Sequence, residues 1–267
     1  MLALAHGTAR AQAPDAAGAV TAAARAHYNA GRSAEALALL QPVIVRPGEP
    51  ARAALVAARA LLERFRASTD PADLATAREH LRAIDASALP AGERRELVVG
   101  LGEALYLEDA FAASAELFEA ALAPSGPASL SGDARERALD WWATALDRHA
   151  QLRPQAERRL VYARIAERME RESREFPSST PAAYWLAAAA RGAGELDRAW
   201  AAAVAAWVRA SMMSDRGAAL RADIDRLVQQ ALIPERSRAL GLAPRDAELA
   251  VAGMQAEWEL IKKNWTR

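Results

Sequence analysis

Residues 95–122 of the chain read RELVVGLGEALYLEDAFAASAELFEAAL. Apolar residues recur at intervals of three and four positions on both sides of Glu108 and Asp109, and this spacing places them on one face of an α-helix. No part of the chain alternates apolar and polar residues as a half-buried strand would. The stretch therefore predicts two helices, 92–107 and 110–123, that fold back on each other as an α-hairpin.

Three other segments repeat this spacing, and such self-similarity is typical of repeat architectures. Small residues in the shared positions let two helices cross closely, because larger side chains would push them apart. The matching residues are Val98, Leu101, Gly102, Leu105, Ser114, Phe118 and Ala121; Val20, Ala23, Ala24, His27, Tyr28, Gly31, Ala36, Leu40 and Val43; Ala183, Leu186, Ala187, Ala190, Gly194, Ala199, Ala203 and Ala206; and, for a first helix alone, Leu139, Trp142, Ala143 and Leu146.

This pattern resembles the tetratricopeptide repeat, and the resemblance covers most of the chain. It implies an all-α solenoid of α-hairpins wound into a right-handed superhelix. The sequence departs from the family pattern in three places. Pro42 lies inside the second helix of the first repeat, the register of 154–176 slips by one residue, and 50–84 fits loosely.

Helical periodicity extends along the whole chain after Pro14. Asp70-Pro71 and Thr180-Pro181 pair an N-cap residue with a proline in the first helical position, and Gly194 is placed where a helix should stop. The helices predicted in this way are 15–29, 33–46, 50–66, 71–84, 92–107, 110–123, 132–149, 154–176, 181–192, 195–213, 216–240 and 245–265.

The chain divides into three predicted regions. Residues 1–13 hold Ala9, Ala11 and Ala13 in the small-x-small pattern of a signal-peptidase site, and predict the tail of a secretion signal; a disordered alanine-rich terminus is the alternative. Residues 14–213 form the repeats. Residues 214–267 form C-terminal helices that cap the array, because a solenoid needs its open end covered.

The last predicted helix carries a single apolar stripe. Its members are Ala247, Val251, Met254, Trp258, Ile261 and Trp265. Spacings of three and four residues give an amphipathic helix with one buried face. We interpret it as the capping helix, and a partner-binding or membrane-surface helix is the alternative.

Composition narrows the possible functions. The chain has 267 residues, 71 of them alanine, the strongest intrinsic helix former. Thirty-four basic residues balance 34 acidic ones, so the basic excess typical of nucleic-acid binders is missing. The chain lacks cysteine, which excludes disulfides and thiolate metal sites. No apolar run reaches the roughly 20 residues that span a bilayer, so we expect no integral membrane protein.

The motifs of common catalytic sites are missing. His27, His80 and His149 are scattered over different hairpins, and no His-Glu-x-x-His or Gly-x-Ser-x-Gly sequence occurs. We therefore expect neither an enzyme nor a cofactor or metal site.

The resemblance implies a concave groove lined by the first helix of each hairpin. The mixture of polar and aromatic residues there suits an extended peptide, although these residues are also compatible with ordinary surface. It lacks the cluster of basic residues that would hold a terminal carboxylate. The positions concerned are Arg25, Tyr28 and Asn29; Glu103 and Tyr106; Thr144, Asp147 and Arg148; and Tyr184 and Arg191.

These observations favour a scaffold that binds a protein or peptide, exported to the bacterial periplasm or secreted. A cytoplasmic location is the alternative. A second hypothesis is a module that binds a small ligand for a solute transport system. The sequence leaves the oligomeric state open.

Overall fold

The computed structural model describes residues 16–44, 50–123, 129–213 and 215–266. Within these ranges the protein is all-α, without a β-strand, as the sequence predicts. The chain forms two compact units, unit 1 (Met1–Glu108) and unit 2 (Asp109–Arg267). The boundary between the units falls between the predicted helices 92–107 and 110–123.

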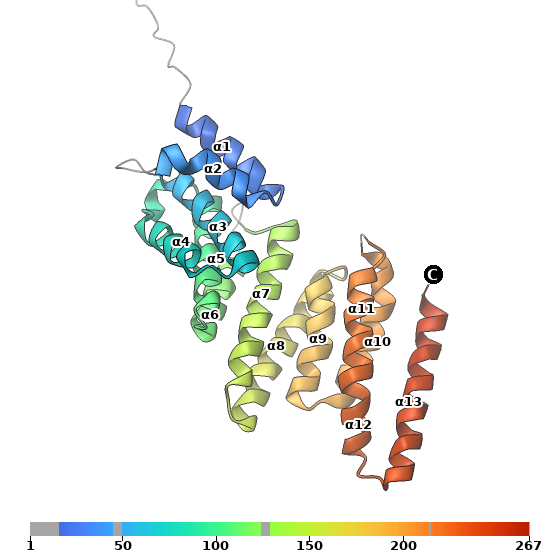
Figure 1. Cartoon of the computed structure of the whole chain (residues 1–267). Helices are drawn as coiled ribbons and strands as arrows, with labels where there is room; N and C mark the ends of the chain where they lie inside the picture. The colour runs from blue at the N-terminus through green and yellow to red at the C-terminus, as the bar shows by residue number, and fades with distance from the viewer. Residues whose placement is uncertain (1–15, 45–49, 124–128, 214, 267) are drawn as a thin grey trace, which may run out of the picture. The chain divides into compact units, whose positions relative to one another are not determined.

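Unit 1 contains five α-helices within its described residues, and chain neighbours pack against each other (Figure 1). Asp70 caps α4 as predicted, since its side chain accepts a hydrogen bond from the Ala72 N–H at 3.0 Å. The helices are α1 (Ala16–Asn29), α2 (Ser33–Ile44), α3 (Ala51–Ser68), α4 (Pro71–Ala83) and α5 (Ala91–Leu107), with a short 3₁₀ turn at Ala86–Ala88.

Helix α3 is the centre of unit 1. All ten residues from Ala53 to Leu62 are buried. One side packs with Leu40 of α2, and another with Leu81 of α4. The small side chains of α3 allow this close packing on every side, because few atoms separate the backbones. Arg59 is the only charged residue within Ala53–Leu62.

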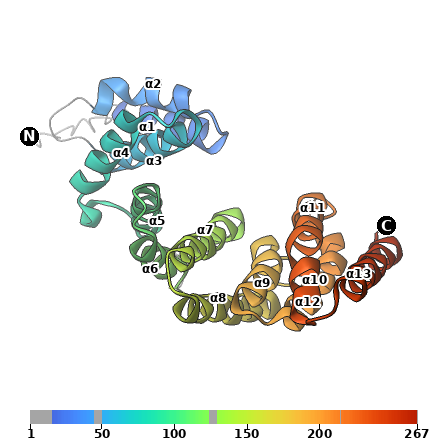
Figure 2. The ribbon, with the colours of Figure 1, turned by 60° about the horizontal axis from the view of Figure 1, so that its bottom comes forward.

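Unit 2 contains the remaining helices, which follow one another in chain order (Figures 1 and 2). Helix α7 packs on α9, and α9 on α11, so these first helices of successive hairpins lie side by side. The helices are α6 (Phe111–Leu122), α7 (Gly132–Gln151), α8 (Gln155–Glu175), α9 (Thr180–Ala193), α10 (Leu196–Arg209), α11 (Ala218–Leu227), α12 (Ile233–Ala239) and α13 (Pro244–Trp265).

Three tryptophans form the centre of the unit 2 core. The ring of Trp258 on α13 is fully buried and lies edge-on to Trp200 and Trp207 of α10, with centroids 6.0 and 5.4 Å apart. Its indole Nε1 donates to Asp225 Oδ1 at 2.8 Å, and Lys262 Nζ contacts the same oxygen at 2.8 Å. Trp200 and Trp207 are therefore core residues; they lie seven positions apart and so share one face of α10.

Most residues of the apolar stripe predicted for α13 pack against the core of unit 2. Val251, Met254 and Ile261 pack beside Trp258 against the core. Trp265 does not, since it is the last residue of the helix and its side chain is 55% exposed. Leu249 and Leu260 are also exposed on this helix.

The predicted helix 216–240 is not continuous. A π-helical turn, Val228–Leu232, separates α11 from α12. Pro234 lies two residues after the end of this turn, and a proline removes one backbone donor and clashes with the carbonyl four residues before it. A widened turn relieves that clash. Among the described helices, none is both long and apolar enough to span a membrane.

Candidate functional site

In unit 1, three of the predicted groove residues are held by contacts within the protein. Arg59 is 8% exposed; its Nη1 lies 3.0 Å from Glu103 Oε2. Its Nε and Nη2 donate to the Tyr28 hydroxyl at 3.2 and 3.0 Å. Arg25 forms an ion pair with Glu96 at 2.7 Å. These bonds join α1, α3 and α5, while Arg25 Nη2 and Arg59 Nη1 are buried without a hydrogen-bond partner among the described residues.

Burial determines the electrostatics of this network. Burial raises the pKa of Glu103, because a carboxylate loses hydration, and the Arg59 guanidinium opposes that rise. Burial acts to lower the pKa of Arg59, but the charge of Glu103 and the contact with Tyr28 raise it above its ordinary value. Each charge is therefore stabilised mainly by its partner.

The other two predicted residues of unit 1 are Asn29 and Tyr106. Asn29 is the last residue of α1 and is exposed. Tyr106 is half-buried close to the end of α5. Of the five predicted positions of unit 1, Arg25, Tyr28 and Glu103 thus take part in contacts between its helices.

In unit 2, a cavity of about 480 Å³ is lined mainly by α7, α8 and α9, and we call it the α7–α9 cavity. The predicted residues Asp147, Tyr184 and Arg191 all line it. Thr144 is half-buried and Arg148 is exposed on α7, and neither lines the cavity. The other lining residues are Gln151, Gln155, Arg158, Arg159, Tyr162, Trp185, Ala188, Gly192, Gly194, Leu227 and Glu235.

Several side chains of the cavity are held in fixed positions. Asp147 accepts hydrogen bonds from the Tyr162 hydroxyl and from Gln151 Nε2, each at 2.7 Å. Arg191 donates to both carboxylate oxygens of Glu235, at 2.9 and 2.8 Å. Burial raises the pKa of the Tyr162 hydroxyl, and its bond to Asp147 raises it further. Tyr162 therefore stays protonated and donates to Asp147.

Glycine at position 192 makes room for this arrangement. A Cβ atom at Gly192 would lie 2.5 to 2.7 Å from ring atoms of Tyr162, closer than carbon atoms approach. The missing side chain lets the Tyr162 ring pack directly on the backbone of α9. The pattern marked Gly194 as a turn residue, and it does end α9 with a φ of +86°.

The repeat pattern missed the contribution of α8 to this cavity. A second helix of a hairpin was expected to face away from the groove, but α8 supplies Arg158, Arg159 and Tyr162. Among the described residues, Arg159 has no charged or hydrogen-bonding partner, and the hydroxyl of Tyr184 has no hydrogen-bond partner. The one available signal was the slipped register of this helix, which turns different residues toward α9.

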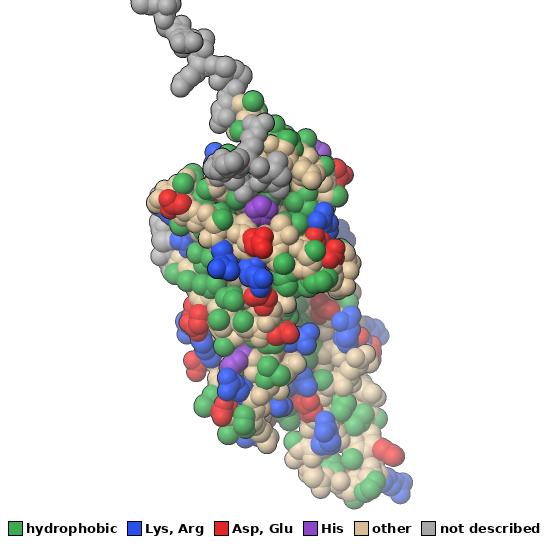
Figure 3. Space-filling view, turned by 60° about the vertical axis from the view of Figure 1, so that its left-hand side comes forward, with side chains coloured by type: hydrophobic (Ala, Val, Ile, Leu, Met, Phe, Trp, Pro, Cys, Tyr) green, Lys and Arg blue, Asp and Glu red, His purple; other side chains and the backbone are tan. Residues whose placement is uncertain are grey.

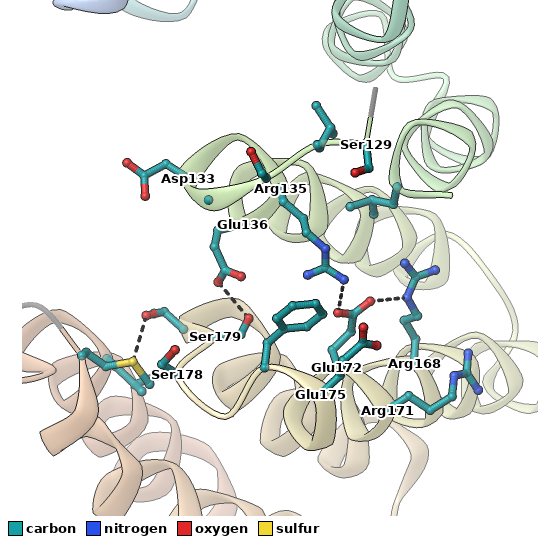
Figure 4. Close-up of a pocket in the computed structure, with 18 of the residues that line it drawn as sticks. Ser129, Asp133, Arg135, Glu136, Arg168, Arg171, Glu172, Glu175, Ser178 and Ser179 are labelled. Atoms are coloured by element: carbon teal, nitrogen blue, oxygen red, sulfur yellow. Dashed lines mark hydrogen bonds and ion pairs between the residues drawn. The ribbon is translucent and has the colours of Figure 1, made fainter. Parts of the chain in front are cut away.

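A second and larger cavity lies where the hairpins of unit 2 end, and we call it the end cleft (Figure 4). Its volume is about 1130 Å³. The C-terminal ends of α6 and α8 line it, together with the N-terminal ends of α7, α9 and α11. Nothing in the spacing of apolar residues indicated this cleft.

Ion pairs link the helices around the end cleft. Glu172 Oε2 contacts Arg135 Nη2 at 2.5 Å, and Glu172 Oε1 accepts from Arg168 Nε at 2.9 Å. The Arg135 guanidinium lies 4.1 Å from the centroid of the Phe176 ring, within the range of a cation–π contact. Figure 4 shows Arg135 reaching from α7 toward Glu172 on α8. These contacts hold α7 against α8.

Ser179 and Glu136 form another contact across the cleft (Figure 4). The Ser179 hydroxyl donates to Glu136 Oε2 at 2.8 Å, and Ser179 Oγ in turn accepts from the Ala182 N–H at 3.3 Å as the N-cap of α9. Burial raises the pKa of Glu136, and its bond to Ser179 acts in the opposite direction. Ser179 is 3% exposed. This serine therefore serves as a helix cap.

We also looked for charged surface patches and for groups of side chains that could hold a metal ion. On the face shown in Figure 3, acidic and basic side chains are interspersed. Within the described residues, no group of three or more His, Asp or Glu side chains is placed to hold a metal ion. The two cavities of unit 2 are therefore the sites to consider.

Comparison of the chain with protein-family models, curated proteins and solved structures found no match.

Proposed function

We propose that the chain is a tetratricopeptide-like repeat protein that binds a peptide or protein segment in the α7–α9 cavity. The observation that carries this proposal is the convergence of Asp147, Tyr184 and Arg191, chosen from the repeat pattern, on one cavity. They come from two successive first helices, α7 and α9, as the groove of the repeat family requires.

The cavity has features that suit a polar, extended guest. Bonds to Tyr162 and Glu235 fix Asp147 and Arg191, so these side chains lose little freedom when a guest binds. Arg159 and the Tyr184 hydroxyl offer hydrogen bonds that no described residue uses. Peptide carbonyls and polar side chains are natural partners for such groups.

The same features argue against the alternative, a small-ligand module. Sites for small molecules are concave, mostly apolar and enclose most of the ligand. The α7–α9 cavity is open to solvent, and arginine, glutamine and acidic side chains make up much of its lining. We therefore prefer a peptide to a metabolite as the guest.

We further propose that the protein works outside the cytoplasm, in the bacterial cell envelope. The support is the small-x-small pattern of Ala9, Ala11 and Ala13, which falls outside the described residues. Fractionation of cells that produce the natural protein tests this. We expect it in the periplasmic or secreted fraction, and recovery from the cytoplasm alone would contradict the proposal.

Selection from a random linear-peptide library tests the binding function. Peptides enriched on the wild-type protein are expected to lose at least about 10-fold in affinity for the double variant Tyr184→Ala/Arg159→Glu, a loss of about 1.4 kcal/mol. The reason is that the variant removes one aromatic contact and reverses one charge in the cavity. Fluorescence anisotropy of labelled peptides measures the affinities.

The matched control is Arg245→Glu/Leu249→Ala on α13. Both residues are exposed and lie away from the cavity, and the change in charge is the same. If the control binds the peptides with unchanged affinity, the loss of affinity in the double variant arises at the α7–α9 cavity. If no peptide is enriched, or if the cavity variant binds the selected peptides as the wild type does, the proposal is wrong.

A further inference from the structure

We propose that the end cleft is a second binding site, whose occupant is an extended peptide segment carrying lysine or arginine side chains. This site is separate from the α7–α9 cavity, because the two cavities share no lining residue. The inference does not depend on the function proposed for the α7–α9 cavity.

The net charge of the residues that line the end cleft indicates which sign of charge a guest would carry. Six carboxylates line the end cleft against three guanidinium groups, which leaves three net negative charges. The arginines are those of positions 135, 168 and 171, and the first two are already paired with Glu172. A cationic guest would therefore meet an excess of carboxylates in a partly desolvated cleft, where charge complementarity has its largest effect.

Several carboxylates are available to such a guest. Asp133 and Glu175 are exposed, and neither has an ion pair or hydrogen bond with another described residue. Glu136 accepts from the Ser179 hydroxyl and from the Thr180 backbone N–H, and its two carboxylate oxygens still have capacity for a further donor. Figure 4 shows Glu136 on α7 and Glu175 on α8, on either side of the space between these helices.

The cleft also provides apolar contacts for the stems of long basic side chains. The ring of Phe176 is 36% exposed and Met212 is 58% exposed. Both residues line the cleft, one at the end of α8 and the other after α10. Lysine and arginine bury their methylene stems along such surfaces while their charged ends reach carboxylates.

The dimensions favour a peptide over a small cation. The volume of about 1130 Å³ exceeds the roughly 300–1,000 Å³ of small-molecule pockets. The cleft extends along the ends of α7, α9 and α11. Helices packed side by side are about 8–10 Å apart, so three of them span about 20 Å, the length of roughly six extended residues.

Binding of fluorescein-labelled decalysine, followed by anisotropy at about 0.1 M ionic strength, tests the proposal, because charges more than about 10 Å apart are then largely screened. The probe is expected to bind the wild-type protein, and the variant Glu136→Gln/Glu175→Gln is expected to bind it at least about 10-fold more weakly. Glutamine keeps the shape of each side chain and an acceptor for Ser179. Labelled decaglutamate is the probe of opposite charge and is expected not to bind.

The matched control is Glu248→Gln/Glu257→Gln on α13. Both residues are exposed and do not line the cleft, and the control likewise removes two negative charges. It is expected to bind decalysine within about twofold of the wild type, because screening weakens distant charges. Asp133→Asn with its control Asp246→Asn gives a second pair, and both residues occupy the first turn of a helix.

Far-UV circular dichroism confirms that each variant is folded before binding is measured. Selective weakening in the cleft variants supports the site. Equal weakening in cleft and control variants would overturn it, since the effect would then reflect net charge alone. Failure of the wild-type protein to bind decalysine, or equally tight binding of decaglutamate, would overturn it as well.

Discussion

Replacing Trp258 by alanine is expected to lower the free energy of unfolding of unit 2 by about 3–5 kcal/mol, the usual cost of emptying a buried tryptophan site. The side chain is fully buried between Trp200 and Trp207. Its removal also takes away the N–H donor to Asp225. Urea unfolding followed by tryptophan fluorescence measures the change, because all seven tryptophans lie between positions 141 and 265.

Trp258→Phe is the control for this prediction. Phenylalanine keeps an aromatic ring between Trp200 and Trp207 but cannot donate to Asp225, so a smaller loss is expected than with alanine. If alanine costs less than about 1 kcal/mol, as surface substitutions do, α13 contributes little to the core and its packing on α10 is incorrectly described.

Replacing Glu103 by leucine is expected to destabilise unit 1 by about 3–5 kcal/mol, because the Arg59 guanidinium is then left buried without its partner. Arg59 and Glu103 side chains are only 10% and 6% exposed. Far-UV circular dichroism during urea unfolding measures the loss. Tryptophan fluorescence reports on unit 2 only, so its transition is expected to change less.

The double variant Arg59→Met/Glu103→Leu separates the two contributions to that loss. Replacing a buried ion pair by apolar residues of similar size is often neutral or stabilising, so this variant is expected to recover most of the stability. Tyr28 would lose its donors from Arg59, which limits the recovery. If the double variant is as unstable as the single one, the cost lies in packing rather than in the unpaired charge.

Local sequence signals were sufficient to predict the positions of most helices. The spacing of apolar residues predicts helices that agree with the structure to within a few residues from α1 to α10, and Asp70 caps α4 as expected. Periodicity is a local property, so one sequence reveals it. The π-helical turn before Pro234 was missed, although proline within a predicted helix was the physical signal for it.

The sites were harder to predict because they depend on contacts between helices. The repeat pattern identified Asp147, Tyr184 and Arg191 in the α7–α9 cavity. It also selected Tyr28 and Glu103, whose partner Arg59 comes from a segment that fits the pattern loosely. An arginine among the apolar residues of α3 was the one visible hint of that buried pair. Nothing in the spacing indicated that the hairpin ends enclose a cleft.

The burial of α3 on all sides restricts the amino-acid substitutions that this helix can accept. An amphipathic helix tolerates change on its solvent side, so its permissive positions recur about every three or four residues. Ala53–Leu62 has no solvent side. Larger side chains would strain the packing at any of these positions, and a lone charge would need a buried counterion. Every consecutive position of this segment is therefore restricted in the residues it accepts, and no tolerant position recurs every three or four residues.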